Sequence, residues 1–122
     1  MATEHWPQEL RLKDGGRLLS VSYEDATFDL SAEYLRVTSP SAEVQGHTAA
    51  QKRTVGGKRR VAITAVEPVG HYAVKLVFDD GHDSGLFTWD YLHELGIEHD
   101  AKWARYLEEL DARNLSRDVP SL

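Results

Sequence analysis

Short stretches of alternating apolar and polar residues mark the strands that this chain is predicted to form. Leu10 and Leu12 alternate with charged neighbours, which is the pattern of a strand with one buried face. A β-rich stretch at 61–66 precedes a longer alternation that begins at Tyr72 and ends at Phe78. Antiparallel strands are therefore expected in both halves of the chain.

Glycine-containing turns lie where these strands would reverse direction. The segment 14–16, Asp-Gly-Gly, separates the first alternating stretch from an apolar one at 17–23. Asp80 and Gly81 follow the alternation that ends at Phe78. Such glycines supply the positive φ that tight turns need. The two turns predict two β-hairpins.

Capping residues predict two helices. Ser31 can cap a short helix over residues 32–36 through its hydroxyl oxygen, and Thr88 can do the same for a second helix. Gly96 is expected to end that second helix, because glycine often takes the left-handed conformation that stops one.

A third helix is expected from Asp100 onward. Trp103, Leu107 and Leu110 fall at i, i+4 and i+7, which places them on one helix face against the core. Together with the antiparallel strands, these helices predict an α+β fold: a mostly antiparallel sheet with two to three helices packed on it.

One domain is expected to span residues 1–122, because a chain of this length can bury enough surface for one core. The stretch 41–57 has little periodicity and several glycines, so a flexible loop at about 41–57 is predicted inside the domain. A frayed tail is expected after about residue 114.

No cysteine is present, and 41% of the residues are hydrophobic. The hydrophobic share predicts a folded protein, and the missing thiols exclude disulfides, cysteine-bound zinc and a cysteine nucleophile. The N-terminus lacks a signal-peptide pattern, and no apolar stretch approaches the roughly 18 residues of a membrane span. We therefore expect a cytoplasmic protein that does not enter the membrane.

Charge is distributed unevenly along the chain, whose net charge is −6. The acidic balance argues against general nucleic-acid binding. One run at 51–60 is nevertheless purely basic, and its side chains and glycine-exposed amides suit an anion or an acidic partner. The alternative is that these charges keep a loop solvated. The basic residues of the run are Lys52, Arg53, Lys58, Arg59 and Arg60.

Three histidines, His82, His93 and His99, lie near several aspartates in the sequence and form the densest set of candidate metal ligands or acid–base groups. Their spacing matches no short zinc motif, since a predicted strand and a helix turn separate the first two. The alternative is that they are solvated residues of turns and helix surfaces. The aspartates are Asp79, Asp80, Asp83 and Asp90.

Catalytic signatures are missing from the sequence. It contains neither a G-x-S-x-G nor an H-E-x-x-H motif, no G-x-G-x-x-G, and no H-x-D or H-x-E pair that could begin an iron site. We therefore expect the chain alone to have no enzyme activity and to need no cofactor.

Two motifs carry a resemblance to a known family. Glu67-Pro-Val-Gly70 and Asp80-Gly-His-Asp-Ser-Gly85 are similar to stretches of the DUF971 family, the gamma-butyrobetaine hydroxylase-like N-terminal domain. The similarity extends from about Trp6 to Glu109 and includes the segment 30–36. Many bacterial members of this family stand alone, so the resemblance implies a stand-alone domain here.

The resemblance implies a zinc position. In eukaryotic hydroxylases such a module precedes an Fe(II)/2-oxoglutarate domain and holds zinc on three cysteines and one histidine. His82 matches that histidine, so it is the one metal-ligand candidate that the resemblance offers. Where the cysteines would fall, this chain has Thr38, Ser39, Ser41 and Ala42. Zinc is therefore not expected here.

The resemblance also implies a class of function. It favours a stand-alone accessory or protein-interaction module that binds an unidentified protein, with self-association left open. One alternative is a metal-binding or iron–sulfur-related accessory protein that uses His82, because similar domains are appended to plant iron–sulfur carrier ATPases. Another is a subunit that works in trans with a separate 2-oxoglutarate oxygenase.

Overall fold

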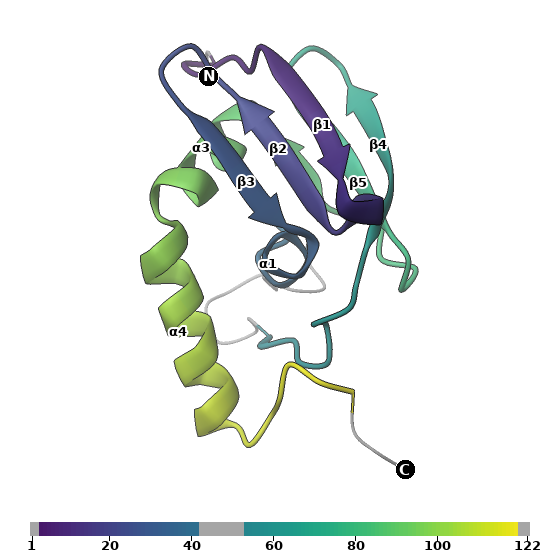
Figure 1. Ribbon diagram of the computed structural model, residues 1–122, viewed down its shortest axis with the longest axis vertical. Coiled ribbons are helices and arrows are strands. Elements are labelled where there is room, and N and C mark those ends of the chain that lie inside the picture. Colours follow the sequence, from purple (N-terminus) through teal and green to yellow (C-terminus); the bar gives the residue numbers. More distant parts are fainter. Residues whose placement is uncertain (1–2, 42–52, 120–122) are drawn as a thin grey trace.

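Two three-stranded antiparallel sheets form the body of the molecule (Figure 1). The computed structural model describes residues 3–41 and 53–119. The first sheet has the order β1-β2-β3, with β1 at Glu9–Lys13, β2 at Leu18–Ser22 and β3 at Thr27–Ser31. The first two strands form the hairpin predicted from the sequence, whereas the third was not predicted.

The turn between β1 and β2 depends on glycine. Asp14, Gly15 and Gly16 all have positive φ, at 53°, 64° and 88°. A side chain at Gly16 would strike the backbone carbonyl of Ile63. The turn therefore closes the hairpin and also lets the first sheet approach the second.

The second sheet has the order β4-β5-β6, with β4 at Ile63–Val69, β5 at Ala73–Phe78 and β6 at Leu86–Thr88. The alternation predicted along β5 is present, since every second side chain from Val74 onward is buried. β6 pairs with the first half of β5, so residues 79–85 form a wide loop between them.

Three helices complete the described part of the chain: α1 at Ala32–Val37, α3 at Trp89–Ile97 and α4 at His99–Ala112. Both predicted caps are present, because Ser31 and Thr88 each accept a 3.0 Å hydrogen bond from a backbone N–H of the first turn. In Figure 1, α1 lies below the first sheet, and α4 runs alongside α1. None of these helices is long and apolar enough to cross a membrane. The predicted α+β class is confirmed.

One hydrophobic core joins both sheets to α1 and α3. Leu19 of the first sheet and Leu76 of the second are both completely buried in it. A smaller cluster of Val37, Tyr106 and Leu110 lies between α1 and α4. The long C-terminal helix is therefore attached mainly through α1 and α3 rather than laid flat on a sheet.

α4 turns a slightly different face inward from the predicted one. Trp103 and Leu110 pack as expected, but Leu107 is 40% exposed and Tyr106 is buried in its place. The buried Tyr106 hydroxyl donates a 2.6 Å hydrogen bond to the Val55 carbonyl, so its polar end is satisfied. A tyrosine with such a partner can replace leucine on the inner face.

Gly96 does not end α3, contrary to the expectation from the sequence. The helix continues to Ile97, and Gly96 has no positive φ. A Cβ at this position would collide with the ring of Phe28 on β3. Glycine is therefore required here because the helix approaches the first sheet closely, and not because the chain turns.

The C-terminal tail, for which fraying is predicted after about residue 114, is held against the body as far as Asp118. The backbone N–H groups of Gly57 and Arg59 donate to tail carbonyls at 2.8 and 3.0 Å. The Arg117 side chain reaches the buried Glu33 of α1. Backbone pairing and a buried ion pair thus replace the expected solvent contact.

Most of the flexible loop predicted at about 41–57 lies outside the described residues, which omit 42–52. Its described end is packed, since Val55 contacts the small cluster beneath α4 and Gly57 pairs with the tail.

Candidate functional site

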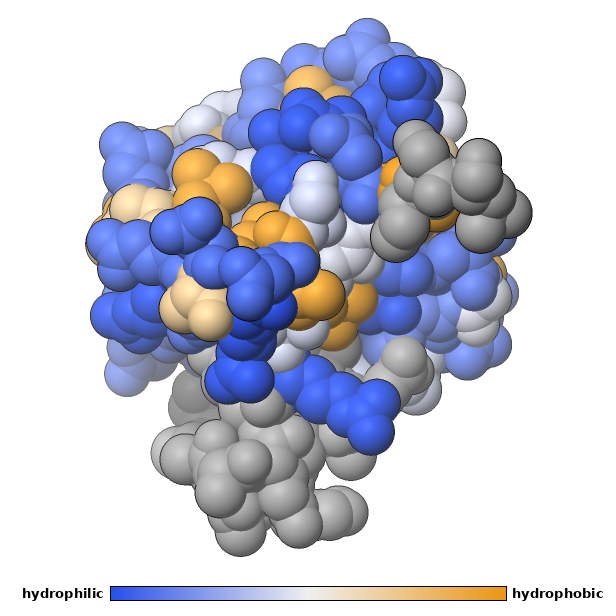
Figure 2. All heavy atoms as spheres, turned by 90° about the horizontal axis from the view of Figure 1, so that it is seen from below, coloured by the Kyte–Doolittle hydropathy of each residue, from blue (hydrophilic) through white to orange (hydrophobic). Residues whose placement is uncertain are grey.

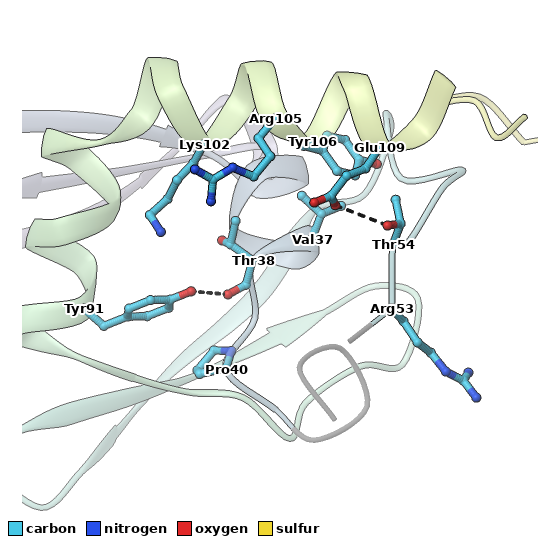
Figure 3. Close-up of a pocket in the computed structure, with 10 residues that line it drawn as sticks. All are labelled: Val37, Thr38, Pro40, Arg53, Thr54, Tyr91, Lys102, Arg105, Tyr106 and Glu109. Atoms are coloured by element: carbon cyan, nitrogen blue, oxygen red, sulfur yellow. Dashed lines mark hydrogen bonds between the residues drawn. The ribbon is translucent and has the colours of Figure 1, made fainter. Parts of the chain in front are cut away.

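A cavity of about 330 Å³ lies between α4, the end of α1 and the segment 53–54; we refer to it as the α4 cavity (Figure 3). Its wall combines three cationic side chains, one carboxylate, two tyrosines and small residues of the α1 end. The lining residues are Val37, Thr38, Pro40, Arg53, Thr54, Tyr91, Lys102, Arg105, Tyr106 and Glu109.

Two cations of α4 give the cavity its charge. Lys102 and Arg105 are one helical turn apart and extend from α4 toward Thr38 (Figure 3). Lys102 Nζ lies 3.5 Å from Glu94 Oε2, and Arg105 forms no ion pair with any residue that the structure describes. These two charges are thus largely available to a ligand.

The remaining charged groups of the wall are less available. Arg53 is exposed, and its guanidinium points away from α4 (Figure 3). The Glu109 carboxylate accepts a 3.2 Å hydrogen bond from the Thr54 hydroxyl. The carboxylate is therefore directed to the edge of the cavity, and positive charge dominates the wall beside α4.

Two tyrosines fix the shape of the cavity. The Tyr91 hydroxyl donates to the Thr38 carbonyl at 2.5 Å, and the Tyr106 hydroxyl donates to the Val55 carbonyl at 2.6 Å. Burial raises the pKa of both tyrosines to about 12. The hydroxyls therefore stay protonated at neutral pH and anchor the wall.

Behind this wall lies His82, which is only 5% exposed. Its Nε2 atom is 2.9 Å from the Ser39 hydroxyl oxygen and 3.4 Å from that of Ser41. Thr38 and Pro40 line the cavity, so alternate residues of 38–41 face opposite sides. His82 therefore contacts the side of segment 38–41 that faces away from the α4 cavity.

Gly85 makes room for this contact. A Cβ at Gly85 would collide with the Ser39 hydroxyl oxygen. The second glycine of the Asp-Gly-His-Asp-Ser-Gly motif therefore has a physical role, because any side chain there would separate the α1 end from the loop that carries His82.

Asp80 holds the same loop from its other end. It accepts hydrogen bonds from Arg36 Nε at 2.8 Å, Lys58 Nζ at 2.6 Å and the His82 backbone N–H at 3.1 Å. Burial alone would raise the pKa of Asp80, but the hydrogen bonds from Lys58, His82 and Arg36 outweigh it and lower the pKa to about 2. Asp80 is therefore a structural anion.

The basic run predicted as an anion or partner site does not form one patch in the described structure. Lys52 lies outside the described residues, and Arg53 borders the α4 cavity. Lys58 pairs with Asp80, and Arg59 pairs with Asp118 of the tail. Of the described residues of the run, Arg53 and Arg60 are exposed and form no ion pair with a described carboxylate.

The three candidate histidines are not brought together either. His82 contacts serines, His93 stacks on His5 with ring centres 3.7 Å apart, and His99 contacts Tyr34 and Asp100. Within residues 3–41 and 53–119, no group of three His, Asp or Glu side chains could hold a metal ion.

The neighbouring aspartates serve the backbone or face solvent. Asp79 accepts from the Ala62 N–H, and Asp90 accepts from the N–H groups of residues 4 and 5. Asp83 is exposed. Lys102 and Arg105 were not among the predicted site residues, because an (i, i+3) pair of cations on a helix usually indicates only a solvated face.

The comparisons with known proteins explain the motifs. The family model described as gamma-butyrobetaine hydroxylase-like, N-terminal matches residues 10–93. This chain belongs to that family. No curated protein matches the chain. The gamma-butyrobetaine hydroxylase-like N-terminal domain therefore includes β1 to β6 and most of α3, whereas α4 and the tail lie beyond the matched residues.

Two solved structures share nearly the whole arrangement, and a third shares about three quarters of it. One solution NMR structure is 49% identical, with a TM-score of 0.83 over 97% of this chain and 94% of the other. A second is 42% identical, with a TM-score of 0.79 over 100% and 97%. A crystal structure of a DUF971 protein of unknown function from Acidithiobacillus ferrooxidans is 42% identical, with a TM-score of 0.62 over 74% and 91%.

The zinc that the family resemblance implies does not fit this member of the gamma-butyrobetaine hydroxylase-like N-terminal domain family. In the part of the chain that the structure describes, the hydroxyls of Ser39 and Ser41 lie next to His82 Nε2, where the resemblance would place thiolates. Structural zinc is held by thiolates, imidazoles and carboxylates, and a neutral hydroxyl is a poor substitute for a thiolate. One imidazole and two hydroxyls are therefore not a zinc site.

Proposed function

We propose that this domain is a non-catalytic accessory module that binds an acidic segment of a partner protein in the α4 cavity. The observation that carries the proposal is the pair Lys102 and Arg105, which face a cavity although the chain as a whole carries a net charge of −6. A concave cationic site on an otherwise acidic protein favours ligands that place a carboxylate inside the cavity over ligands that are merely charged.

The dimensions of the α4 cavity support a peptide ligand. Its volume of about 330 Å³ lies at the small end of the range for ligand pockets, which is enough for one or two side chains. Guanidinium groups bind carboxylates through two parallel hydrogen bonds, so Arg105 is the natural first contact. The distant contact between Lys102 and Glu94 is weak, and a ligand carboxylate can replace it.

Exposed apolar side chains lie on other parts of the surface, outside the lining of the α4 cavity. Leu107 of α4 is 40% exposed, and Leu115 and Val119 of the tail are 43% and 75% exposed. Viewed from below, the molecule shows hydrophobic side chains among hydrophilic ones (Figure 2). The proposed acidic ligand therefore depends on the charges of the α4 cavity and not on these apolar side chains.

The chemistry of the cavity also supports a non-catalytic role. Its tyrosines are protonated at neutral pH and donate to backbone carbonyls. The one serine–histidine contact nearby, Ser39 with His82, is enclosed, since Ser39 is 0% exposed. A nucleophile that no substrate can reach does not make a catalytic site.

Binding of a short Glu-rich peptide, compared with its Lys-rich counterpart, tests the proposal. Calorimetric titration should detect binding of the acidic peptide only, and R105S should weaken it by about tenfold. R113S is the matched control, because Arg113 is an exposed arginine at the end of the same helix and outside the cavity. Its affinity should stay within about twofold of the unmodified protein.

Co-purification from cell extract extends the test to the natural partner. A protein captured by the unmodified domain and by R113S, but not by R105S or K102S, would agree with the proposal. Equal weakening by R105S and R113S would contradict it, since it would show that only the general charge matters. Thermal midpoints of all variants should be unchanged, which separates binding from folding.

A further inference from the structure

Two further cavities, of about 320 and 270 Å³, lie beside the C-terminal tail, and we call them the tail cavities. Arg59 and Arg117 line both of them, so the two cavities adjoin. The tail lies beside the segment that leads into β4 (Figure 1), and the N–H groups of Gly57 and Arg59 donate to its carbonyls. Neither cavity shares a lining residue with the α4 cavity. The tail cavities are therefore a separate candidate site.

Positive charge exceeds negative charge around the tail cavities. Their lining includes four arginines and two carboxylates of the described chain, so the excess is two charges. One arginine and one carboxylate are already joined, because Arg117 donates hydrogen bonds of 2.8 and 2.7 Å to Glu33. On a chain with a net charge of −6, such a local excess attracts anions. The arginines are Arg17, Arg59, Arg60 and Arg117, and the carboxylates are Glu33 and Asp118.

Arg17 brings a guanidinium that no carboxylate of the described residues neutralises. It lies between the turn at 14–16 and β2, and its Nη2 atom donates a 3.1 Å hydrogen bond to the Arg59 carbonyl. A guanidinium has several N–H donors, so one bond to the backbone holds the group in place and leaves other donors for a ligand. Arg17 therefore adds positive charge beside Arg59.

Asp118 shows that an oxyanion fits against Arg59. The Nε and Nη2 atoms of Arg59 donate to the two Asp118 carboxylate oxygens at 2.5 and 3.3 Å. Guanidinium groups bind phosphate through the same paired geometry. The Asp118 side chain is 61% exposed, and such surface pairs contribute little stability. A ligand with a stronger charge can therefore take the place of this carboxylate.

We propose that the tail cavities bind the phosphate group of a small ligand, and that Asp118 occupies the phosphate position in the unliganded protein. A phosphate monoester carries about −1.5 to −2 charges at neutral pH, which matches the excess of two better than a carboxylate does. Rotation of the Asp118 side chain is enough to free Arg59, because the pairing of the tail uses backbone groups. This site goes beyond the peptide binding proposed for the α4 cavity, and either site can exist without the other.

Titration with inorganic phosphate at constant ionic strength tests the site, followed through the Nε–H resonances of the arginine side chains. We expect saturable shifts at Arg17 and Arg59, and about tenfold weaker binding by R17S. R60S should also weaken binding, and it gives a second variant if R17S does not fold. R113S is the matched control and should stay within about twofold, because Arg113 is exposed and lines neither tail cavity.

The role of Asp118 has its own test. D118N removes the competing carboxylate, so it should bind phosphate about two- to fivefold more tightly than the unmodified protein. D25N makes the same change in net charge at an exposed residue between β2 and β3, and it should have almost no effect. Equal tightening by D118N and D25N would show that Asp118 does not occupy the phosphate position.

The choice of anion identifies the ligand class. Tighter binding of glycerol 3-phosphate than of inorganic phosphate would identify a phosphate monoester as the ligand, and equal binding would identify free phosphate; both results support the proposal. Acetate that binds as tightly as phosphate would overturn it. So would phosphate binding that R105S abolishes and R17S leaves unchanged, because the anion would then lie in the α4 cavity.

Discussion

Arg117 donates two hydrogen bonds, of 2.8 and 2.7 Å, to the carboxylate of Glu33, which is only 5% exposed. The same guanidinium lies 5.2 Å from the ring centre of Trp103 on α4. One tail side chain thus connects α1 and α4. It also explains how a glutamate is tolerated inside a short buried helix, since its charge is fully paired.

Replacing Arg117 should therefore destabilise the fold. R117M leaves the Glu33 carboxylate buried without its partner, and we expect a loss of about 2 kcal/mol in the free energy of unfolding. The loss should be smaller than for a fully enclosed pair, because the Arg117 side chain is 30% exposed. Urea denaturation measures it.

The double variant E33L/R117M supplies the control for this prediction. It removes both charges, so much of the lost stability should return. A double variant no more stable than R117M would show that the tail contact, rather than the unpaired charge, is responsible.

Acid should weaken the link between Asp80 and its partners. The pKa of Asp80 is lowered from 3.8 to about 2 in the folded protein. A lowered pKa contributes stability above the unfolded value, and this contribution is lost as the pH falls from 3.8 toward 2. The difference in unfolding free energy between the unmodified protein and D80N should therefore shrink over that range. A constant difference would exclude Asp80 as the titrating group.

Gly96→Ala should destabilise the protein even though alanine is the better helix former. A Cβ at position 96 would collide with the Phe28 ring, and overpacking of this kind costs about 1–3 kcal/mol. Thermal unfolding measures the effect. In an F28A background the same substitution should be neutral or stabilising by up to about 1 kcal/mol. An equal loss of stability with Phe28 and with F28A would show that the backbone at position 96, and not the Phe28 ring, causes the effect.

Gly85→Ala should separate Ser39 from His82. We expect a loss of about 1–3 kcal/mol in unfolding free energy together with changed His82 ring resonances. Gly15→Ala is the control: its cost comes only from the positive φ of 64°, since no atom lies within 4 Å of a Cβ there. Gly15→Ala should leave the His82 resonances unchanged, and a similar change in both variants would contradict this assignment.

Local signals in the sequence were sufficient for much of the fold. Ser31 and Thr88 cap helices because a hydroxyl before a helical pattern satisfies backbone N–H groups regardless of the tertiary fold. Gly96 was misinterpreted for the opposite reason. Its role depends on Phe28, a residue on another element, and a single sequence does not show which positions touch.

The candidate site was less accessible to prediction from the sequence. The histidine motif drew attention to His82, but its partners Ser39 and Ser41 have no sequence signature of their own. The basic run at 51–60 was a visible charge cluster, yet Lys58 and Arg59 neutralise distant carboxylates. We propose the α4 cavity as the site because Arg105, unlike Lys58 and Arg59, forms no ion pair with a described residue.

The segment 38–41 separates the α4 cavity from His82. Thr38 and Pro40 face the α4 cavity, while Ser39 and Ser41 face His82 on the other side. Any ligand that displaces the front of this stretch must alter the hydrogen bonds at its back. The ring resonances of the buried His82 should therefore change when a ligand occupies the α4 cavity, although the imidazole does not line that cavity.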